Sequence, residues 1–309
     1  MSNQNNIQLS IIIPVYNRLN ELRMTLASLT RQTLPFTDFE ICIADDGSSE
    51  DVSSLIAEFR RAFPAMQIKY ADQEDRGYRV AAARNLGADL ATGRLWVYSD
   101  NGIILKSSVL ETHIKHHDAN EENLVILGNM HGTGWGTDEN RLRQILDANP
   151  FDYDAAIAAM KAEGFGDGRT IRYIFDRFSY DIDSWYIPWL ALWSGHFSVN
   201  AGFVKKHGIR WNERFNTWGG EDNEYGIQLC EVGGSLQFFA DIEVAHYPTP
   251  GSKAVNIGDK EEFKRNYQKT KELILELHPT REVETWFCIG GEANDPAERE
   301  KLFKAKGWE

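Results

Sequence analysis

The sequence of 309 residues has no run rich in lysine and arginine and no apolar stretch long enough to cross a bilayer. Lys and Arg number 33 against 46 Asp and Glu, so the formal net charge is -13, which argues against nucleic acid as a partner. The polar segment 1–8 lacks the basic-then-apolar pattern of a signal peptide. We therefore expect a soluble, cytoplasmic protein without an integral membrane segment.

Cysteine is also scarce. Cys42, Cys230 and Cys288 are widely spaced and form no C-x-x-C pair, which fits reduced core thiols better than disulfides or a zinc site. No glycine-rich, lysine-containing phosphate loop follows the first apolar run, and this argues against a nucleotidyltransferase. Hydrophobic residues make up 42% and aromatic residues 12%, enough for one large α/β domain or two smaller ones.

The first hundred residues alternate between two kinds of pattern. Short apolar runs rich in branched residues predict buried strands, and amphipathic stretches between them predict helices. The predicted strands are 9–15, 39–44, 67–71 and 95–98, and the predicted helices are 20–32, 52–63 and 80–90. This order is typical of an open α/β sheet, in which ligands bind outside the carboxyl ends of the strands.

Acidic residues follow two of these strands. Asp45 and Asp46 come after the second and Asp100 after the fourth, so they are candidates to bind a nucleobase, a ribose or a diphosphate. Three acids in one cleft need a cation, usually Mg²⁺ or Mn²⁺, when the ligand is a diphosphate. The Asp-Gly-Ser turn also fits a simple cap on the next helix. Arg84, among small residues, fits either a buried partner for an Asp or a phosphate fork.

The stretch Trp218-Gly219-Gly220-Glu221-Asp222 is the strongest candidate for a catalytic segment. Two glycines allow a tight turn and a close approach to a ligand, and two adjacent carboxylates then begin a predicted helix. A carboxylate in this place is a plausible general base. Acidic residues at a helix start also have a structural explanation, because they interact favourably with the helix dipole.

The motifs, taken in order, resemble the nucleotide-sugar-dependent glycosyltransferases of the GT-A fold family 2. The resemblance spans residues 7–255 and rests on Pro14-Val15-Tyr16-Asn17, Asp45-Asp46-Gly47-Ser48, Ala83-Arg84-Asn85-Leu86-Gly87, Asp100, Trp218-Gly219-Gly220-Glu221-Asp222 and His246. Within that family the sequence is similar to bacterial chondroitin-polymerase-type domains and, more distantly, to polypeptide N-acetylgalactosaminyltransferases. It implies an α/β, Rossmann-like GT-A fold with a mostly parallel central sheet flanked by helices.

The resemblance also implies a role for individual residues. It makes Asp222 the general base with Glu221 beside it, and it places the donor and acceptor sugars near Gly195, His196, Trp218, Gly219 and Gly220. Nucleotide binding is expected at Pro14, Tyr16, Asn17, Asp45, Asp46, Arg84 and Asp100. Asp100 and His246 would hold Mn²⁺ or Mg²⁺. Gly102 replaces the second acid of the family's Asp-x-Asp motif, which leaves metal dependence open.

The implied reaction is transfer of a sugar from a nucleoside-diphosphate donor to an acceptor hydroxyl. Uridine is the expected base because the family commonly uses it, and the acceptor stays open between a glycan, a lipid-linked sugar, a small metabolite and a peptide. Inverting relatives favour a single displacement, but the polypeptide-modifying relatives retain configuration, so the stereochemistry also stays open. The alternative function is non-catalytic binding of a sugar nucleotide or glycan, which Gly102 favours.

The sequence suggests a division of the chain. We expect a GT-A domain over 1–255, with a nucleotide-binding half (1–127), a variable insertion on the acceptor side (128–190) and an acceptor and catalytic half (191–255). The insertion would begin with a glycine-rich loop, 128–136. The aromatic segment 185–193 fits either core packing or stacking on a sugar. A helical extension over 256–309 would pack on the catalytic domain or mediate a homodimer.

Overall fold

The computed structural model describes residues 7–133, 137–167, 180–248 and 260–284. The strands are β1 (Leu9–Val15), β2 (Phe39–Asp45), β3 (Gln67–Asp72), β4 (Leu95–Ser99), β5 (Ile103–Leu105), β6 (Leu124–His131), β7 (His196–Asn200) and β8 (Ser235–His246). The α-helices are α1 (Leu19–Leu29), α2 (Val52–Ala62), α3 (Val80–Leu90), α4 (Val109–Asp118), α5 (Glu139–Ala148), α6 (Tyr153–Ala162), α8 (Ala201–His207), α9 (Glu221–Glu231) and α11 (Lys260–Leu277). Two short 3-10 helices, η1 (Ile182–Ser184) and η2 (Pro188–Ala191), precede β7.

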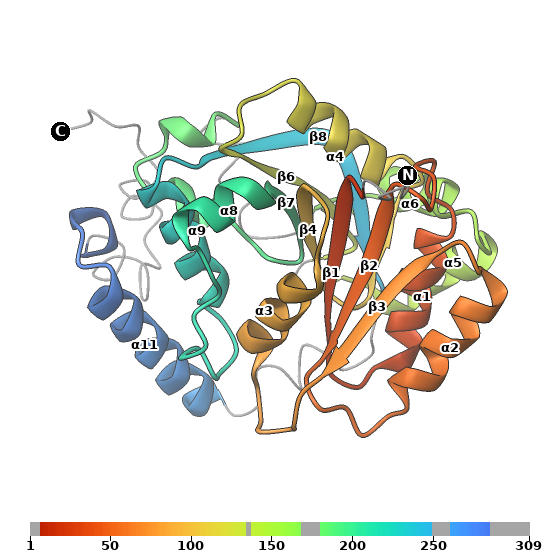
Figure 1. Ribbon diagram of the computed structural model, residues 1–309, viewed down its shortest axis with the longest axis horizontal. Coiled ribbons are helices and arrows are strands. Elements are labelled where there is room, and N and C mark those ends of the chain that lie inside the picture. The colour runs from red at the N-terminus through yellow and green to blue at the C-terminus, as the bar shows by residue number, and fades with distance from the viewer. Residues whose placement is uncertain (1–6, 134–136, 168–179, 249–259, 285–309) are drawn as a thin grey trace, which may run out of the picture.

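The strands form one eight-stranded sheet in the order β3-β2-β1-β4-β7-β6-β8-β5. Strands β1 to β4 are parallel to their neighbours in this half of the sheet, and β6 is parallel to β8. Strand β7 runs antiparallel to both β4 and β6, and β5 runs antiparallel to β8. The predicted mostly parallel sheet, flanked by helices, is therefore confirmed (Figure 1).

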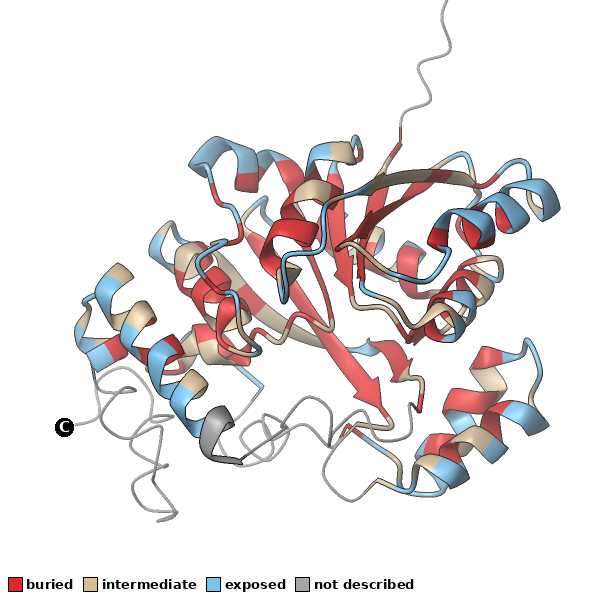
Figure 2. Ribbon diagram, turned by 90° about the horizontal axis from the view of Figure 1, so that it is seen from below, coloured by how far each residue is buried: buried red, intermediate tan, exposed pale blue. Residues whose placement is uncertain are grey.

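Both faces of the sheet are covered, which explains why its strands are apolar throughout. In β1, Leu9, Ile11 and Ile13 pack with residues of α1, α2 and α4, whereas Ile12 packs on the opposite face with residues of α3 and α9. Every residue of β1 is buried, as expected of a strand covered on both faces. The outer faces of the helices are exposed, as Figure 2 shows.

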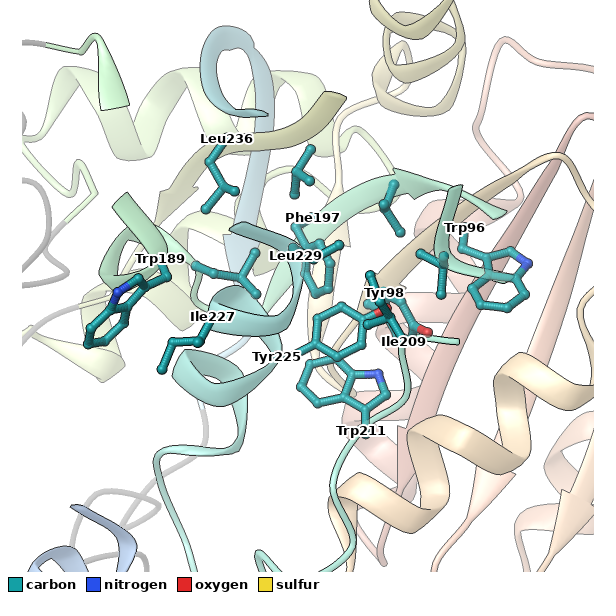
Figure 3. Packing of buried hydrophobic residues seen from close by; sticks show 14 of the residues in the cluster. Trp96, Tyr98, Trp189, Phe197, Ile209, Trp211, Tyr225, Ile227, Leu229 and Leu236 are labelled. Carbon is teal, nitrogen blue, oxygen red and sulfur yellow. The ribbon is translucent and has the colours of Figure 1, made fainter. Parts of the chain in front are cut away.

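An aromatic cluster fixes α9 against the middle of the sheet (Figure 3). Trp211 stacks on Tyr225 of α9 with ring centroids 4.2 Å apart, and Tyr98 of β4 stacks on Phe197 of β7 at 5.0 Å. Such pairs contribute about 0.5–1.5 kcal/mol each beyond the area they bury. The position of α9 is therefore set by the same two strands whose ends carry Asp100 and Gly195.

Strand β6 differs from the prediction. The glycine-rich loop expected at 128–136 begins inside this strand, because residues 128–131 are extended and hydrogen-bonded in the sheet. Gly128 allows close packing instead of a turn, since a Cβ there would lie 2.4 Å from Cγ2 of Ile242. Residues 134–136 of the expected loop are outside the described ranges. The proposed start of the insertion, at residue 128, thus falls within a strand of the central sheet.

The predicted C-terminal helix is present as α11, which lies alongside α9 (Figure 1). Ile274 and Val283 are fully buried in the core cluster that contains Tyr225 of α9. Packing of this segment against α9 is therefore observed, while dimerisation stays a prediction. The tail from residue 285, with Cys288, is outside the described ranges. No helix in the described part of the chain has the length and apolarity required to cross a membrane.

Candidate active site

Arg84 of α3 joins the segments that form the site. Its side chain is buried, and its guanidinium donates hydrogen bonds to Asp100 Oδ1 at 2.9 Å, to Ser194 Oγ at 2.8 Å and to Glu221 Oε1 at 3.2 Å. The guanidinium also lies 4.4 Å from the ring centroid of Trp211. Burial lowers and the charges of Asp100 and Glu221 raise the pKa of Arg84, with a net increase, so Arg84 remains a cation.

The small residues of α3 explain how Arg84 reaches this place. A Cβ on Gly87 would lie 2.6 Å from Cγ2 of Ile12, so only a glycine lets the helix approach β1 this closely. Asn85 accepts a hydrogen bond from Trp211 N at 3.0 Å and donates one to Trp211 O at 2.9 Å. The motif Ala83-Arg84-Asn85-Leu86-Gly87 thus holds α3 to the sheet, positions Trp211 and directs Arg84 into the site.

The acidic pair Glu221 and Asp222 begins α9, as predicted. Gly219 and Gly220 both have φ of +95°, which turns the chain sharply before the helix. Glu221 is buried and pairs with Arg84, and its Oε2 atom has no hydrogen-bond partner. Burial and the charge of Glu221 raise the pKa of Asp222 to about 7, although Arg84 acts in the opposite direction. A carboxylate that exchanges its proton near neutral pH is suited to general base catalysis.

Asp100 and Gly195 meet at the carboxyl end of β4. The amide of Asp100 donates to Gly195 O at 2.9 Å, and Ser99 is paired with His196 in the β4–β7 ladder. The predicted neighbourhood of Asp100, Gly195 and the acidic pair is therefore formed. His196 is buried, with Nδ1 3.2 Å from Ser99 Oγ and Nε2 3.0 Å from His113 Nε2. Its observed contacts are with these residues beneath the site.

Tyr16 and Asp46 directly follow the carboxyl ends of β1 and β2. Tyr16 is 49% exposed and its hydroxyl donates to Asp75 Oδ2 at 3.1 Å. Asp46 accepts hydrogen bonds from Gln73 Nε2 at 2.5 Å and from Arg79 N at 2.9 Å. Burial raises the pKa of Asp46 despite these hydrogen bonds. Both carboxylate oxygens of Asp46 thus accept hydrogen bonds within the protein, and recognition of a base or ribose by Tyr16 and Asp46 stays a prediction.

Three other predicted nucleotide-binding residues have structural partners. Pro14 lies in β1 opposite Ala44 of β2. Asn17 Oδ1 accepts from Ser49 N at 2.9 Å, which ties the loop after β1 to the loop after β2. Asp45 Oδ1 accepts from Ser48 N at 2.9 Å, as expected of a turn cap, and its Oδ2 accepts from the Tyr70 hydroxyl at 3.0 Å. Their binding roles remain predictions.

The metal-binding residues predicted from the Asp-x-Asp position make an incomplete set. Gly102 has φ of +94°, and a Cβ there would lie 3.4 Å from Cβ of Glu21, so the backbone disfavours an aspartate at this position. His246 is paired with Ile103 in the β5–β8 ladder. Ile103 follows Asp100 by three positions in the sequence, so His246 lies near Asp100. No three His, Cys, Asp or Glu side chains gather as potential ligands within the described ranges. A divalent cation would therefore need oxygen ligands from a bound diphosphate.

The sequence analysis missed two residues that contact Arg84. Ser194 stands next to the predicted Gly195, and Trp211 lies in a segment without a motif. Trp218, which was predicted, is 46% exposed beside the acidic pair. The proximity of Ser194 to Gly195 was the only available signal for either missed residue, since no local pattern marks Trp211.

Comparison with known sequences supports the resemblance. The model of glycosyl transferase family 2 matches residues 10–180. Validoxylamine A glucosyltransferase of Streptomyces hygroscopicus subsp. jinggangensis is 33% identical over 225 residues, which cover 73% of this chain and 52% of that protein. Chondroitin synthase of Escherichia coli is 30% identical over 279 residues, covering 79% of this chain and 35% of that protein. This chain spans about half the length of the first of these relatives.

Comparison with solved structures supports the fold. TarS of S. aureus, in complex with UDP-GlcNAc, superimposes with a TM-score of 0.63 and 15% identity over 96% of this chain and 78% of the TarS chain. At this identity the match shows a shared fold alone, and it agrees with the predicted GT-A architecture. The family match covers more than half of the 309 residues. The chain therefore belongs to glycosyl transferase family 2.

Proposed function

We propose that this protein transfers a sugar from a UDP-sugar to an acceptor hydroxyl, with Asp222 as the general base. The observation that carries this proposal is the acidic pair at the start of α9, which Arg84 links to Asp100 at the strand ends. Support also comes from the family and from relatives whose names are those of a glucosyltransferase and a polysaccharide synthase. The complexes of TarS with UDP and UDP-GlcNAc favour uridine as the base.

In the proposed reaction, Asp222 removes the proton of an acceptor hydroxyl. The hydroxyl oxygen attacks the anomeric carbon while the bond from that carbon to the diphosphate oxygen breaks. The products are the glycoside and UDP, and the proton remains on Asp222 until solvent removes it. One displacement of this kind inverts the anomeric configuration. A positioned general base typically contributes about 10²–10⁴-fold to the rate.

The donor would lie along the carboxyl ends of β1, β2 and β4. The uracil and ribose would contact Tyr16 and Asp46, and the diphosphate would lie toward Asp100 and Arg84. A fixed cation in a buried site stabilises the charge that develops on a leaving group without reorganisation. Arg84 is a buried cation in direct contact with Glu221 of the acidic pair, so it is suited to this role.

A divalent cation, Mn²⁺ or Mg²⁺, would be held by Asp100, His246 and the diphosphate oxygens. When bound, it would supply further positive charge beside the leaving diphosphate. Because the protein contributes only part of the ligand set, we expect the cation to bind together with the nucleotide and not before it. The cation would therefore increase nucleotide affinity, and the nucleotide would increase cation affinity.

The proposed base is tested by Asp222→Asn, with Asp89→Asn as the matched control. Asp89 lies on α3 and forms an exposed ion pair with Arg210, outside the site. UDP release from UDP-glucose and UDP-N-acetylglucosamine should fall about 10²–10⁴-fold in the Asp222 variant and stay unchanged in the control. UDP affinity should be kept in both variants.

Unchanged turnover in Asp222→Asn would remove Asp222 from the role of base. Binding of UDP-sugars by the unaltered protein, without any release of UDP or free sugar in the presence of an acceptor mixture, would instead favour the non-catalytic binding function. The two outcomes differ because the first concerns one residue and the second concerns the activity.

A further inference from the structure

A cavity of about 720 Å³ lies next to the C-terminal half of the sheet. Its lining includes Asn129 and His131 from β6, Phe238 from β8, Lys161 from α6, and Asp167 and Tyr180, which lie between α6 and η1 in the sequence. The proposed reaction uses none of these residues. The volume lies within the range of about 300–1,000 Å³ typical of small-molecule sites, and it can hold one or two sugar rings.

The strand register places this cavity beside the reaction site. Strand β7 lies between β4 and β6, with Ser99 opposite His196 and Leu127 opposite Phe197. Residues 129–131 therefore continue along β6 toward the same end of the strands at which Asp100 follows β4. A Cβ on Gly195 would lie 2.4 Å from Met130 Cε and 4.0 Å from Asp100 Oδ2. Only the width of β7 separates the end of β6 from Asp100.

The cavity also lies on the face of the sheet that carries α9. Side chains alternate along β6, so Asn129 and His131 share a face with Leu127. Leu127 packs in the cluster that contains Tyr225 of α9. The face that carries the cavity is thus the face that α9 covers, and Asp222 lies in the first turn of α9.

A buried imidazole in the lining has an unused polar atom. His131 is 4% exposed, and its Nδ1 atom has no hydrogen-bond partner, whereas its Nε2 atom is 3.3 Å from Glu243 Oε1. Burial lowers the pKa of His131 although Glu243 raises it, so the ring is neutral at pH 7. Leaving a buried polar atom unpaired costs about 1–3 kcal/mol, and a ligand hydroxyl would recover that cost.

The charged side chains described around the cavity do not favour an anionic ligand. Lys161 and Lys106 both pair with Glu243, the latter at 2.8 Å, and Asp167 adds a further carboxylate to the lining. Among the described residues named here, two positive and two negative side chains therefore lie near neutral His131. Asp167 Oδ2 also accepts from the amide of Met130 at 3.0 Å, which orders this side of the cavity.

An aromatic surface completes the lining. The ring of Tyr180 is 38% exposed and its centroid lies 5.1 Å from that of Phe238. Aromatic rings offer flat apolar contact area, and the ring carbons of a sugar present a matching apolar surface. Hydroxyl groups at the edge of a sugar would then meet the polar atoms of Asn129 and His131.

We propose that this cavity binds a neutral sugar ring of the acceptor, with the ring against Tyr180 and Phe238 and its hydroxyls toward Asn129 and His131. The inference rests on the proposed function, because it names the substrate class on the acceptor side of the same site. A sugar bound in this way would present its reactive hydroxyl past Gly195 toward Asp222.

The test uses saturation-transfer NMR on the full chain in the presence of UDP. The probes are methyl β-glucoside, methyl β-galactoside and N-acetylglucosamine, with glucuronate as the anionic comparison. We expect a saturation-transfer signal from at least one neutral sugar. That signal should be at least fivefold weaker in Tyr180→Ala and in Phe238→Ala. Phe151→Ala is the matched control, because Phe151 is an exposed aromatic residue outside the cavity. UDP signals should persist in all variants.

The outcomes separate the inference from the proposed function. UDP saturation without any neutral-sugar saturation, or neutral-sugar saturation that survives in both cavity variants, would overturn the inference and leave the proposed function standing. Stronger saturation of glucuronate than of every neutral sugar would overturn the neutral class. Absence of a saturation-transfer signal from UDP with the unaltered protein would contradict the proposed function itself.

Discussion

The protonation of Asp222 responds to its surroundings at pH values near neutrality. Burial and the neighbouring carboxylate of Glu221 both disfavour its charged form, and they raise its pKa to about 7. Binding of a diphosphate would add negative charge nearby and act in the same direction. The proposed base, Asp222, is thus partly ionised near neutral pH.

This property predicts an acidic limb in the pH profile. Only the ionised form of Asp222 can accept a proton, so kcat/KM should rise with pH and level off above about 7. Below that value kcat/KM should fall about tenfold for each pH unit, provided that one group controls the limb. The measurement is initial-rate UDP release between pH 5 and pH 9. A profile that stays flat down to pH 5 would contradict the assignment.

Position 220 requires glycine for two separate reasons. Its φ is +95°, and a Cβ would lie 2.0 Å from Cγ2 of Thr270 on α11. Gly220→Ala should therefore be destabilising through both strain and overpacking. Gly233→Ala is the matched control, because Gly233 has φ of +87° and no atom within 4 Å of the added Cβ.

Urea unfolding of the two variants separates the two effects. Strain should cost each variant about 1 kcal/mol, and overpacking should cost the Gly220 variant about 1–3 kcal/mol more. Gly220→Ala/Thr270→Ser should recover part of that excess, because serine lacks the methyl group. Equal destabilisation of Gly220→Ala and Gly233→Ala would show that α11 does not restrict the backbone at Gly220.

Single residues show clearly what the sequence could predict at the site. The glycine pair, Glu221 and Asp222 were recognisable because they are adjacent in the sequence and together form one motif. Trp211 was not, since its hydrogen bonds with Asn85 join positions 126 residues apart. Contacts of this kind arise from the packing of α3 and α9, and no local period reveals them.

At the scale of elements, α11 holds α9 at two places. Near the start of α9, Gly220 packs under Thr270. Further along, His278 follows α11 and lies between two carboxylates, with Nε2 3.0 Å from Glu224 Oε1 and Nδ1 3.0 Å from Glu231 Oε1. The helix that carries the proposed base is therefore oriented by a segment far along the chain.

The His278 contacts predict a pH-dependent part of the stability. Burial lowers and the hydrogen bonds with Glu224 and Glu231 raise the pKa of His278, with a net increase. The contribution is fully present below about 6.5, the usual pKa of histidine in an unfolded chain, and is lost as pH rises through the higher folded value. The free energy of unfolding should thus fall between pH 6 and pH 9 more steeply than in His278→Gln.

Urea unfolding at each pH value measures this difference. Asp241→Asn is a control for histidine contacts elsewhere, because exposed Asp241 pairs with half-buried His116 on α4. Parallel pH curves for the unaltered protein and His278→Gln would contradict the charged contact between α11 and α9.

Elements with a strong period were predictable, and those defined by distant partners were not. The predicted helix 80–90 is α3 with the same bounds, and the helical extension predicted over 256–309 contains α11, Lys260–Leu277. Strand β6 was partly mistaken for a loop because Gly128, Asn129 and Gly132 interrupt its apolar run. Its extended form comes from pairing with β7 and β8, whose residues follow more than sixty positions later.

At the scale of the whole molecule, the sheet gathers motifs that the sequence spreads over more than two hundred residues. Tyr16, Asp46 and Asp100 follow parallel strands, so they lie at one edge of the sheet. The antiparallel β7 then delivers Gly195 to that edge, and α9 brings Asp222. The sequence predicted the parallel half from its alternating pattern. It could not predict the position of β7 between β4 and β6, because long-range pairing decides it.

The most direct measurement is the shift of the thermal midpoint by UDP, GDP and dTDP, each with and without Mn²⁺. A nucleotide at about 100 times its dissociation constant adds about 2.7 kcal/mol of stability, enough to raise the midpoint visibly. We predict that UDP gives the largest shift, that Mn²⁺ increases it, and that Mn²⁺ alone gives none. If no nucleotide shifts the midpoint with or without Mn²⁺, the protein does not bind a nucleotide-sugar donor and the proposed function is wrong.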